Sequence, residues 1–201
     1  MLTNIFISGL GGQGVVTLAN LIAQCASEHG LKVSVFNSRG MAQRGGRVTS
    51  EIRISDNKNF IYGARISSGQ ADILLGMEIG ESINSISYLK ELGTAVILDY
   101  SFIPSEMILK KEAYPSQKET SELFLKKTKN LFFVDNPVSP YNIFLLGVFV
   151  LLIPLIDKEL TFLTQSEVEK SILTIIKRET ELSLKTFRQG YEYGAKLAES
   201  L

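Results

Sequence analysis

The segment Gly9-Leu-Gly-Gly-Gln-Gly14 is the first stretch whose residue types and spacing could do chemistry. It fits the G-x-G-x-x-G pattern and lies between a short apolar run at 4–8 and a helical periodicity at 15–29. Glycine tolerates positive φ and has no Cβ, so the backbone here can turn tightly and approach a phosphate. The N–H groups and the dipole at the start of the following helix favour such an anion. A tight turn that binds nothing is the alternative. The predicted phosphate contacts are Gly9, Gly11, Gly12, Gln13 and Gly14.

A second loop, Arg39-Gly-Met-Ala-Gln-Arg-Gly-Gly-Arg47, combines three arginines with three glycines. Successive glycine N–H groups can form an anion nest, and arginine binds phosphate or carboxylate bidentately. The loop follows a predicted strand at 32–36, so we expect it beside the first glycine loop, at the carboxyl edge of the sheet where ligands of open α/β sheets bind. The alternative is a turn whose arginines pair with acids or carbonyls. The predicted ligand or partner contacts are Arg39, Arg44, Gly45 and Gly46, with Arg47 as a further candidate.

The formal net charge is zero, but its distribution along the chain is uneven. Residues 1–50 contain four cations, Lys32, Arg39, Arg44 and Arg47, against the single acid Glu28, which gives +3. The other residues hold 17 cations and 20 acids, which gives −3. A positive field around both glycine loops favours an anionic ligand or an acidic partner, with ordinary surface scatter as the alternative.

A dinucleotide site makes one further demand, which this sequence does not meet. In NAD-binding folds an Asp or Glu ends the second strand and holds the ribose hydroxyls. Here that strand ends Phe36-Asn-Ser-Arg39, without an acid. Arg39 keeps an NADP-like variant open, although no downstream pattern is typical of hydride transfer. A self-contained NAD(P)-dependent dehydrogenase is therefore the second hypothesis, and a pure assembly module whose loops bind nothing is the third.

The elements that must position these loops alternate along the chain. A strand at 4–8, a helix at 15–29 ended by Gly30, and a strand at 32–36 make a βαβ unit. Residues 47–54 alternate as a strand does, and residues 60–62 are predicted to return as a hairpin. We expect one domain over residues 1–201, with an α/β, Rossmann-like, doubly wound and mainly parallel sheet, a β-hairpin insertion and C-terminal helices. The other predicted elements are strands at 71–75, 94–98 and 131–134, a helix at 79–92, and a long amphipathic helix or a pair of helices at 166–200.

The stretch from Asn136 to Ile156 has no charged residue, which raises the question of a membrane span. Three prolines interrupt it, and its apolar run begins only at Ile143, whereas a span needs about 20 residues. We therefore predict a buried or subunit-covered helix and no membrane partner. Asn142, at the start of this helix, is a further candidate for contact with a ligand, and an N-cap is the alternative role.

Composition excludes several kinds of site in this chain of 201 residues. One Cys cannot hold an iron–sulfur cluster, which takes about four thiolates, and one His makes a His-based zinc site or a Ser-His-Asp triad unexpected. We predict no catalytic and no metal-ligating residue. No basic and aromatic residues interleave as in nucleic-acid-binding proteins, and no secretion signal is evident, so a cytoplasmic protein without a nucleic-acid partner is expected.

Together the two glycine motifs resemble those of a known family. Gly9-Leu-Gly-Gly-Gln-Gly14 followed by Gly40-Met-Ala-Gln-Arg-Gly-Gly46 is similar to the gamma component of 2-oxoacid:ferredoxin oxidoreductases, and among them to the beta subunit of indolepyruvate ferredoxin oxidoreductase. One departure is Asn37-Ser38-Arg39, where the indolepyruvate branch often has a Glu-x-His-like stretch, and it leaves the 2-oxoacid open. Further similarities cover Val48–Ile54, Gln70-Ala-Asp72, Asn142 with Leu146-Gly147, and Phe187 with Gly190-Tyr191.

The resemblance implies a non-redox subunit of a larger enzyme that converts a 2-oxoacid to an acyl-coenzyme A. Thiamine diphosphate and the iron–sulfur clusters then belong to a partner subunit, which passes electrons to ferredoxin. This chain would supply part of the coenzyme A-binding surface and scaffold the assembly. It would be inactive alone, and a homodimer of the isolated chain is possible.

Overall fold

A computed structural model of the chain describes residues 2–40, 45–57, 63–156 and 159–199. Within them a sheet of six strands has the order β2-β3-β1-β4-β5-β6. Strands β4, β5 and β6 are parallel to β1, and β3 runs antiparallel to both of its neighbours, β1 and β2. The predicted α/β, mainly parallel architecture is confirmed. The strands are β1 (Leu2–Leu10), β2 (Lys32–Arg39), β3 (Arg47–Ser55), β4 (Ala71–Gly76), β5 (Leu89–Leu98) and β6 (Asn130–Val134).

The apolar run that predicted the first strand forms the centre of the sheet. In β1 the residues from Thr3 to Leu10 are buried, and Ile5 faces Ile52 of β3 on one side and Ile73 of β4 on the other. The edge strand β2 has no buried residue, since only β3 pairs with it. The predicted βαβ unit therefore forms with β3 inserted between its two strands.

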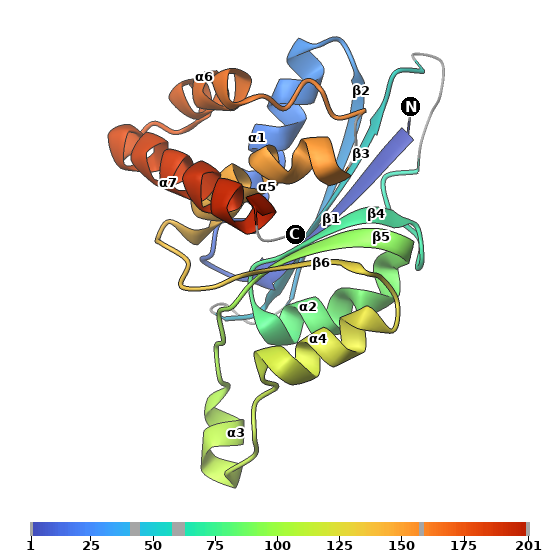
Figure 1. Cartoon of the computed structure of the whole chain (residues 1–201), viewed down its shortest axis with the longest axis vertical. Helices are drawn as coiled ribbons and strands as arrows, with labels where there is room; N and C mark the ends of the chain where they lie inside the picture. The colour runs from blue at the N-terminus through green and yellow to red at the C-terminus, as the bar shows by residue number, and fades with distance from the viewer. Residues whose placement is uncertain (1, 41–44, 58–62, 157–158, 200–201) are drawn as a thin grey trace.

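Helices cover both faces of the sheet (Figure 1). On one face α1 (Val15–Glu28) and α5 (Tyr141–Ile156) share a large apolar core with the strands, and α6 (Gln165–Ile175) and α7 (Thr180–Glu199) lie outside them. The other face carries α2 (Ile79–Ser85) and α4 (Gln117–Leu125). A short helix, α3 (Ser105–Lys110), stands away from the body at the bottom of Figure 1.

The uncharged stretch forms α5, most of whose residues are buried, so the predicted buried helix is confirmed. In the described part of the chain, no helix has the length and apolar character needed to cross a membrane.

The end of one predicted helix and the hairpin partner of β3 differ from the sequence expectation. The helix expected at 79–92 ends at Ser85, and after a 3-10 turn (Ile86–Tyr88) the strand β5 already begins at Leu89, which pairs with Ala71. At 166–200 the structure has the pair of helices, one of the two predicted alternatives: α6 and α7, with Glu179 at a φ of 55° between them. The hairpin partner of β3 is β2, and the predicted return strand at 60–62 lies outside the described residues.

Candidate functional site

The first glycine loop turns the chain from β1 into α1 as its composition predicts. Gly12 and Gly14 have φ values of 96° and 83°, a region that favours glycine. Gly14 is the N-cap of α1, and no side chain caps this end. The first helical hydrogen bond runs from Leu18 N to Gly14 O at 2.9 Å, so the N–H groups at 15–17 have no partner inside the helix. The start of α1 therefore presents backbone donors suited to an anion.

The two glycine loops lie side by side, as expected. Gly11 N donates to Gly46 O at 2.9 Å, which joins the β1–α1 loop to the end of the β2–β3 loop. Gly40 N donates to Arg47 O at 2.6 Å and closes the base of that second loop. The first loop and the described ends of the second are thus fixed at the edge of the sheet where β1 ends.

Gln13 lies in the loop but its side chain is engaged within the protein. Its Oε1 accepts from Leu10 N at 2.7 Å, and its Nε2 donates to Met77 O at 3.2 Å. The amide therefore ties the loop to the ends of β1 and β4. Gly9 leaves room for it, because a Cβ on Gly9 would lie 2.8 Å from Gln13 Oε1. In the structure Gly9 and Gln13 therefore hold the conformation of the loop.

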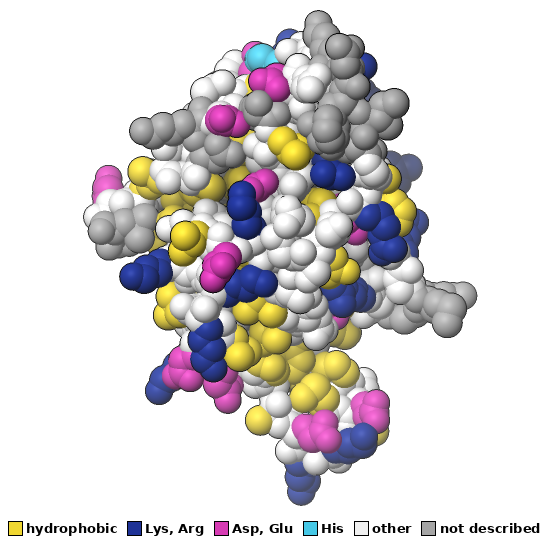
Figure 2. Space-filling view, turned by 90° about the vertical axis from the view of Figure 1, so that its right-hand side faces the viewer, with side chains coloured by type: hydrophobic (Ala, Val, Ile, Leu, Met, Phe, Trp, Pro, Cys, Tyr) yellow, Lys and Arg dark blue, Asp and Glu magenta, His cyan; other side chains and the backbone are white. Residues whose placement is uncertain are grey.

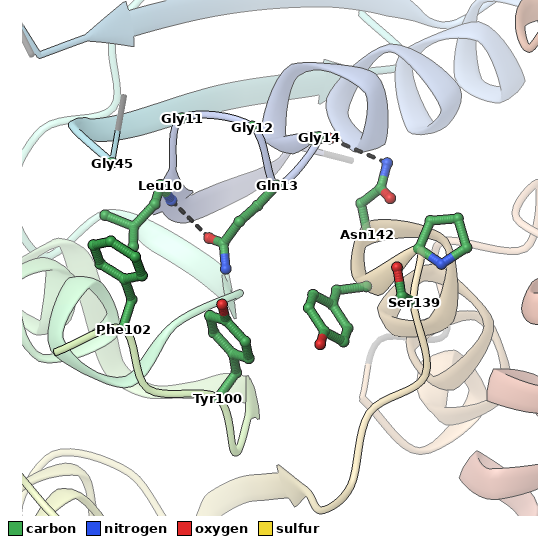
Figure 3. Close-up of a pocket in the computed structure, with 12 residues that line it drawn as sticks. Leu10, Gly11, Gly12, Gln13, Gly14, Gly45, Tyr100, Phe102, Ser139 and Asn142 are labelled. Carbon is green, nitrogen blue, oxygen red and sulfur yellow. Dashed lines mark hydrogen bonds between the residues drawn. The ribbon is translucent and has the colours of Figure 1, made fainter. Parts of the chain in front are cut away.

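A cavity of about 700 Å³ opens in front of the first loop (Figure 3). One wall is the glycine loops, and the opposite wall consists of residues that follow β5 and β6. The rings of Tyr100 and Tyr141 meet there with centroids 4.9 Å apart. The cavity lies at the carboxyl ends of parallel strands, the edge that open α/β sheets use for ligands. Its lining residues are Leu10, Gly11, Gly12, Gln13, Gly14, Gly45, Tyr100, Phe102, Ser139, Pro140, Tyr141 and Asn142.

Asn142 joins the two helices that begin at this cavity. It lies in the first turn of α5, is 7% exposed, and donates from Nδ2 to Gly14 O at 3.3 Å. A Cβ on Gly14 would lie 2.4 Å from that Nδ2, so glycine is required there by space as well as by φ. The side chain thus fixes the N-terminus of α5 against the N-terminus of α1 (Figure 3).

The arginines of the second loop are placed differently from one another. Arg39 is exposed at the end of β2 and does not line the cavity. Arg47 turns toward α2, where Nη2 donates to Ser85 Oγ at 3.1 Å and Nε lies 3.4 Å from Glu81 Oε2. Arg44 lies outside the described residues. The described lining therefore contains no arginine, and backbone N–H groups are the donors that it offers to an anion, with Gly45 in the lining and Gly46 next to it in the chain.

The pair formed by Arg47 and Glu81 lies on the α2 side of the sheet, away from the described lining of the cavity. Burial raises the pKa of the Glu81 carboxyl, Arg47 opposes that rise, and the nearby Glu78 adds to it. Arg47 therefore has a structural role. It matches the alternative predicted for this loop, in which an arginine pairs with an acid.

The sequence prediction missed the aromatic wall of the cavity. Tyr100 and Phe102 come shortly after the strand predicted at 94–98, and residues 139–141 follow the strand predicted at 131–134. Their place after parallel strands puts these segments at the same carboxyl edge as the glycine loops, but no pattern in them indicated contact with a ligand. The site combines uncapped N–H donors with rings and a few polar groups, which suits a phosphate-bearing ligand with a planar or apolar part.

Comparison with known sequences places the chain in a family. Residues 4–193 match the family described as Pyruvate ferredoxin/flavodoxin oxidoreductase. The chain belongs to this family. The resemblance to its gamma-type members, predicted from the two glycine motifs, is confirmed.

Curated relatives carry subunit names. The chain is 37% identical over 120 residues to the indolepyruvate oxidoreductase subunit IorB of Pyrococcus horikoshii, a match covering 60% of this chain and 58% of that protein. It is 30% identical over 127 residues to the pyruvate/ketoisovalerate oxidoreductases common subunit gamma of Pyrococcus furiosus, covering 63% and 60%. The chain thus spans less than two thirds of the length of the curated relatives it matches.

Solved structures resemble the chain over nearly its whole length. The pyruvate oxidoreductase subunit PORC of Thermotoga maritima superposes with a TM-score of 0.66 at 19% identity, covering 95% of this chain and 96% of that one. The gamma subunit of a keto/oxoacid ferredoxin oxidoreductase from Geobacter sulfurreducens gives a TM-score of 0.61 at 25% identity, with 96% and 99% coverage. The first of these supports the fold alone.

Proposed function

We propose that this chain is the non-redox, gamma-type subunit of a 2-oxoacid:ferredoxin oxidoreductase of the indolepyruvate type. In this proposal it provides part of the coenzyme A-binding surface and scaffolds the assembly. The indolepyruvate assignment is supported by the name of the relative at 37% identity, against 30% for the pyruvate/ketoisovalerate relative. The partner subunit would hold thiamine diphosphate and the iron–sulfur clusters and would pass electrons to ferredoxin.

This chain does not have the cysteine ligands that an iron–sulfur cluster needs. Cys25 is its single cysteine, is fully buried in the core, and has its Sγ 3.2 Å from Ser171 Oγ. Burial raises the pKa of that thiol, which keeps it protonated. A cluster takes about four thiolates, so redox chemistry in the complex would be carried by another subunit.

The observation that carries the coenzyme A proposal is the meeting of the two glycine loops beside the uncapped start of α1. Coenzyme A has a diphosphate, a 3′-phosphate and an adenine ring. In this proposal the N–H groups at 12 and 14–17 donate to phosphate oxygens, and Tyr100 and Phe102, which line the cavity, offer ring faces. We propose that Gly11, Gly12 and Gly14 are the main phosphate contacts. Gly45, Gly46, Arg44 and Arg39 would extend them, and Gly9, Gln13 and Asn142 would hold the loop.

Calorimetric titration tests this proposal on two preparations, the purified chain and the complex purified with its partner subunit. We expect saturable binding of coenzyme A to the complex, and weaker binding of 3′-dephospho-coenzyme A, which lacks one phosphate. Oxidation of a 2-oxoacid should require both subunits. If neither preparation binds coenzyme A, the ligand role is wrong, and the assembly-module and dehydrogenase hypotheses are left.

The dehydrogenase hypothesis predicts a different outcome in the same titration. It requires NADH or NADPH to bind the chain alone and hydride transfer without a partner. Asn37, near the position where an NAD site has an acid, instead accepts a hydrogen bond from Ser50 Oγ at 2.6 Å. We therefore expect no saturable change with either nicotinamide cofactor.

A further inference from the structure

Residues 102–114, here called the arm, leave the body of the protein after β5 and return before α4. The helix at the tip, α3, has no buried residue, and Ile108 and Leu109 in it are 62% and 83% exposed. Figure 2 shows this lobe at the bottom of the molecule, with hydrophobic side chains gathered where it joins the body. A helix this short has little stability of its own, so the contacts at the base of the arm determine its position.

A single carboxyl group fixes both ends of the arm. Glu78 follows β4, is 1% exposed, and caps α2 by accepting from Glu81 N at its Oε2 (2.8 Å). Its Oε1 accepts from Phe102 N at 3.1 Å and from Tyr114 Oη at 2.7 Å. One oxygen atom thus accepts hydrogen bonds from both the first and the last residue of the arm.

The local packing suits this arrangement. A Cβ on Gly80 would lie 2.2 Å from Tyr114 Oη, so glycine at this position lets the hydroxyl reach Glu78. Burial, together with the hydrogen bond to Glu78, raises the pKa of Tyr114, so its hydroxyl stays a donor throughout the physiological range. A buried carboxyl group is costly unless its oxygens are hydrogen-bonded, and here three donors satisfy them.

The arm begins at the rim of the cavity. Phe102 lines the cavity, and a Cβ added to Gly45 would lie 3.3 Å from Phe102 Cε1. Figure 3 shows the Phe102 ring beside Leu10 and Gly45, on the side of the first glycine loop away from Asn142. The backbone N–H of this residue is one of the groups that Glu78 holds.

We infer that Glu78 and Tyr114 are positioning residues for the ligand of this cavity. One Glu78 oxygen accepts hydrogen bonds from both ends of the arm, from Phe102 N and from Tyr114 Oη. In this inference, these bonds hold the Phe102 ring at the rim, against Gly45, where it closes one side of the phosphate-binding surface. The inference rests on the proposed coenzyme A site and assigns specific residues to its support. Neither residue lines the cavity.

The test uses Tyr114→Phe, which keeps the ring and removes the hydroxyl. Tyr193→Phe is the matched control, because the Tyr193 hydroxyl also takes part in a hydrogen bond, which it accepts from Asp135 N at 2.9 Å, outside the lining of the cavity. Each variant is studied in the complex for coenzyme A affinity and as the isolated chain for melting temperature and tryptic cleavage after Lys110 and Lys111. We expect Tyr114→Phe to lower the affinity for coenzyme A about fivefold to tenfold and to speed tryptic cleavage in the arm. Its melting temperature should be like that of the control.

A second variant shows whether the effect passes through Phe102. Phe102→Ala alone should lower the affinity for coenzyme A. Adding Tyr114→Phe to it should cause no further loss of affinity, since coupled residues give non-additive effects. If wild type binds coenzyme A and Tyr114→Phe binds as tightly as the control, the inference is overturned while the site stands. If the two losses multiply independently, Tyr114 does not act through Phe102 and the inference is also wrong. If wild type binds no coenzyme A, the proposed function fails first and this inference with it.

Discussion

Glycines at the cavity and glycines between α5 and α7 satisfy different physical requirements. Gly12 has a φ of 96°, and a Cβ placed on it would meet nothing within 4 Å. Where α5 crosses α7, a Cβ on Gly147 would lie 2.1 Å from Phe187 O, and one on Gly190 would lie 2.1 Å from Phe144 O. At the cavity glycine provides a backbone conformation and leaves open space, whereas at the crossing it allows two backbones to touch.

The contrast separates binding from packing within one set of family-like motifs. Both the Gly9–Gly14 loop and the pair Gly147 and Gly190 contributed to the sequence resemblance. In the structure Gly11, Gly12 and Gly14 of the first group line the cavity described above, and Gly147 and Gly190 are not among its lining residues. Substitutions in the two regions should therefore affect different measurements.

The largest effect on stability is expected for Gly147→Ala. The added methyl meets backbone atoms of α7, which cannot move aside as a side chain can, so we expect a loss of about 3 kcal/mol or more, at the upper end of overpacking effects. Urea unfolding followed by circular dichroism measures it. Gly194→Ala is the control, because its nearest contacts are at 3.1 Å and include the Leu151 side chain, and it should cost clearly less. Equal losses in the two variants would contradict the close backbone crossing.

Gly12→Ala should separate the two regions most sharply, because it should act on the ligand more than on stability. A non-glycine residue at positive φ costs about 1 kcal/mol. Gly30→Ala is matched to it: Gly30 has a φ of 73°, nothing lies within 4 Å of an added Cβ, and it lies at the other end of α1. Both variants should lose similar stability. Only Gly12→Ala should lower the affinity for coenzyme A, by about tenfold, which corresponds to a loss of about 1.4 kcal/mol in binding free energy. A similar loss of affinity in Gly30→Ala would mean that strain, and not the cavity, is responsible.

Asn142 lies between the two regions and should show an intermediate effect. Asn142→Ala removes the hydrogen bond to Gly14 O, with an expected loss of about 1 kcal/mol in unfolding free energy. Asn142→Asp places an acidic group beside the proposed phosphate site and should weaken coenzyme A further, and more at low salt than at high salt. Calorimetry at two salt concentrations measures this, and equal affinity of the Ala and Asp variants at low salt would argue against a nearby phosphate.

The smallest effect is expected for the ion pair on the surface of the packing region. Arg188 of α7 binds Glu169 of α6 through two contacts of 2.8 Å, and this hydrogen bonding lowers the pKa of Glu169. Because the folded-state pKa lies below the unfolded value, the pair stabilises the fold above the ordinary Glu pKa, and this stability is lost as pH falls through the folded value. Arg188→Ala should cost little at pH 7, as the loss of a surface ion pair does, and progressively less in acid, with unchanged coenzyme A affinity. Unfolding curves at several pH values test this, and a cost that grows in acid would contradict it.

The sequence predicted those parts of the site that depend on local chemistry. The β1–α1 turn follows from glycines at positions of positive φ, and the helix α1 from its apolar periodicity. The meeting of the two loops followed from a single rule about the carboxyl edge of the sheet. These features involve residues close together in the chain or one general property of the fold.

Features that depend on distant partners could not be predicted in the same way. Alternation in residues 47–54 indicates a strand but not its neighbours, so the insertion of β3 between β1 and β2 was not foreseen. The role of Arg47 depends on Glu81 and Ser85, which only folding brings near. Phe102 lies in a segment without periodicity, and its position depends on a buried carboxyl group from another element.

Hydrogen exchange of the complex, with and without coenzyme A, tests the central claim most directly. We predict that coenzyme A slows exchange at residues 11–17 and 45–46 and leaves the amides at the α5–α7 crossing unchanged. Protection confined to other parts of the chain, or none at all in a complex that binds coenzyme A, would contradict the assignment of this cavity.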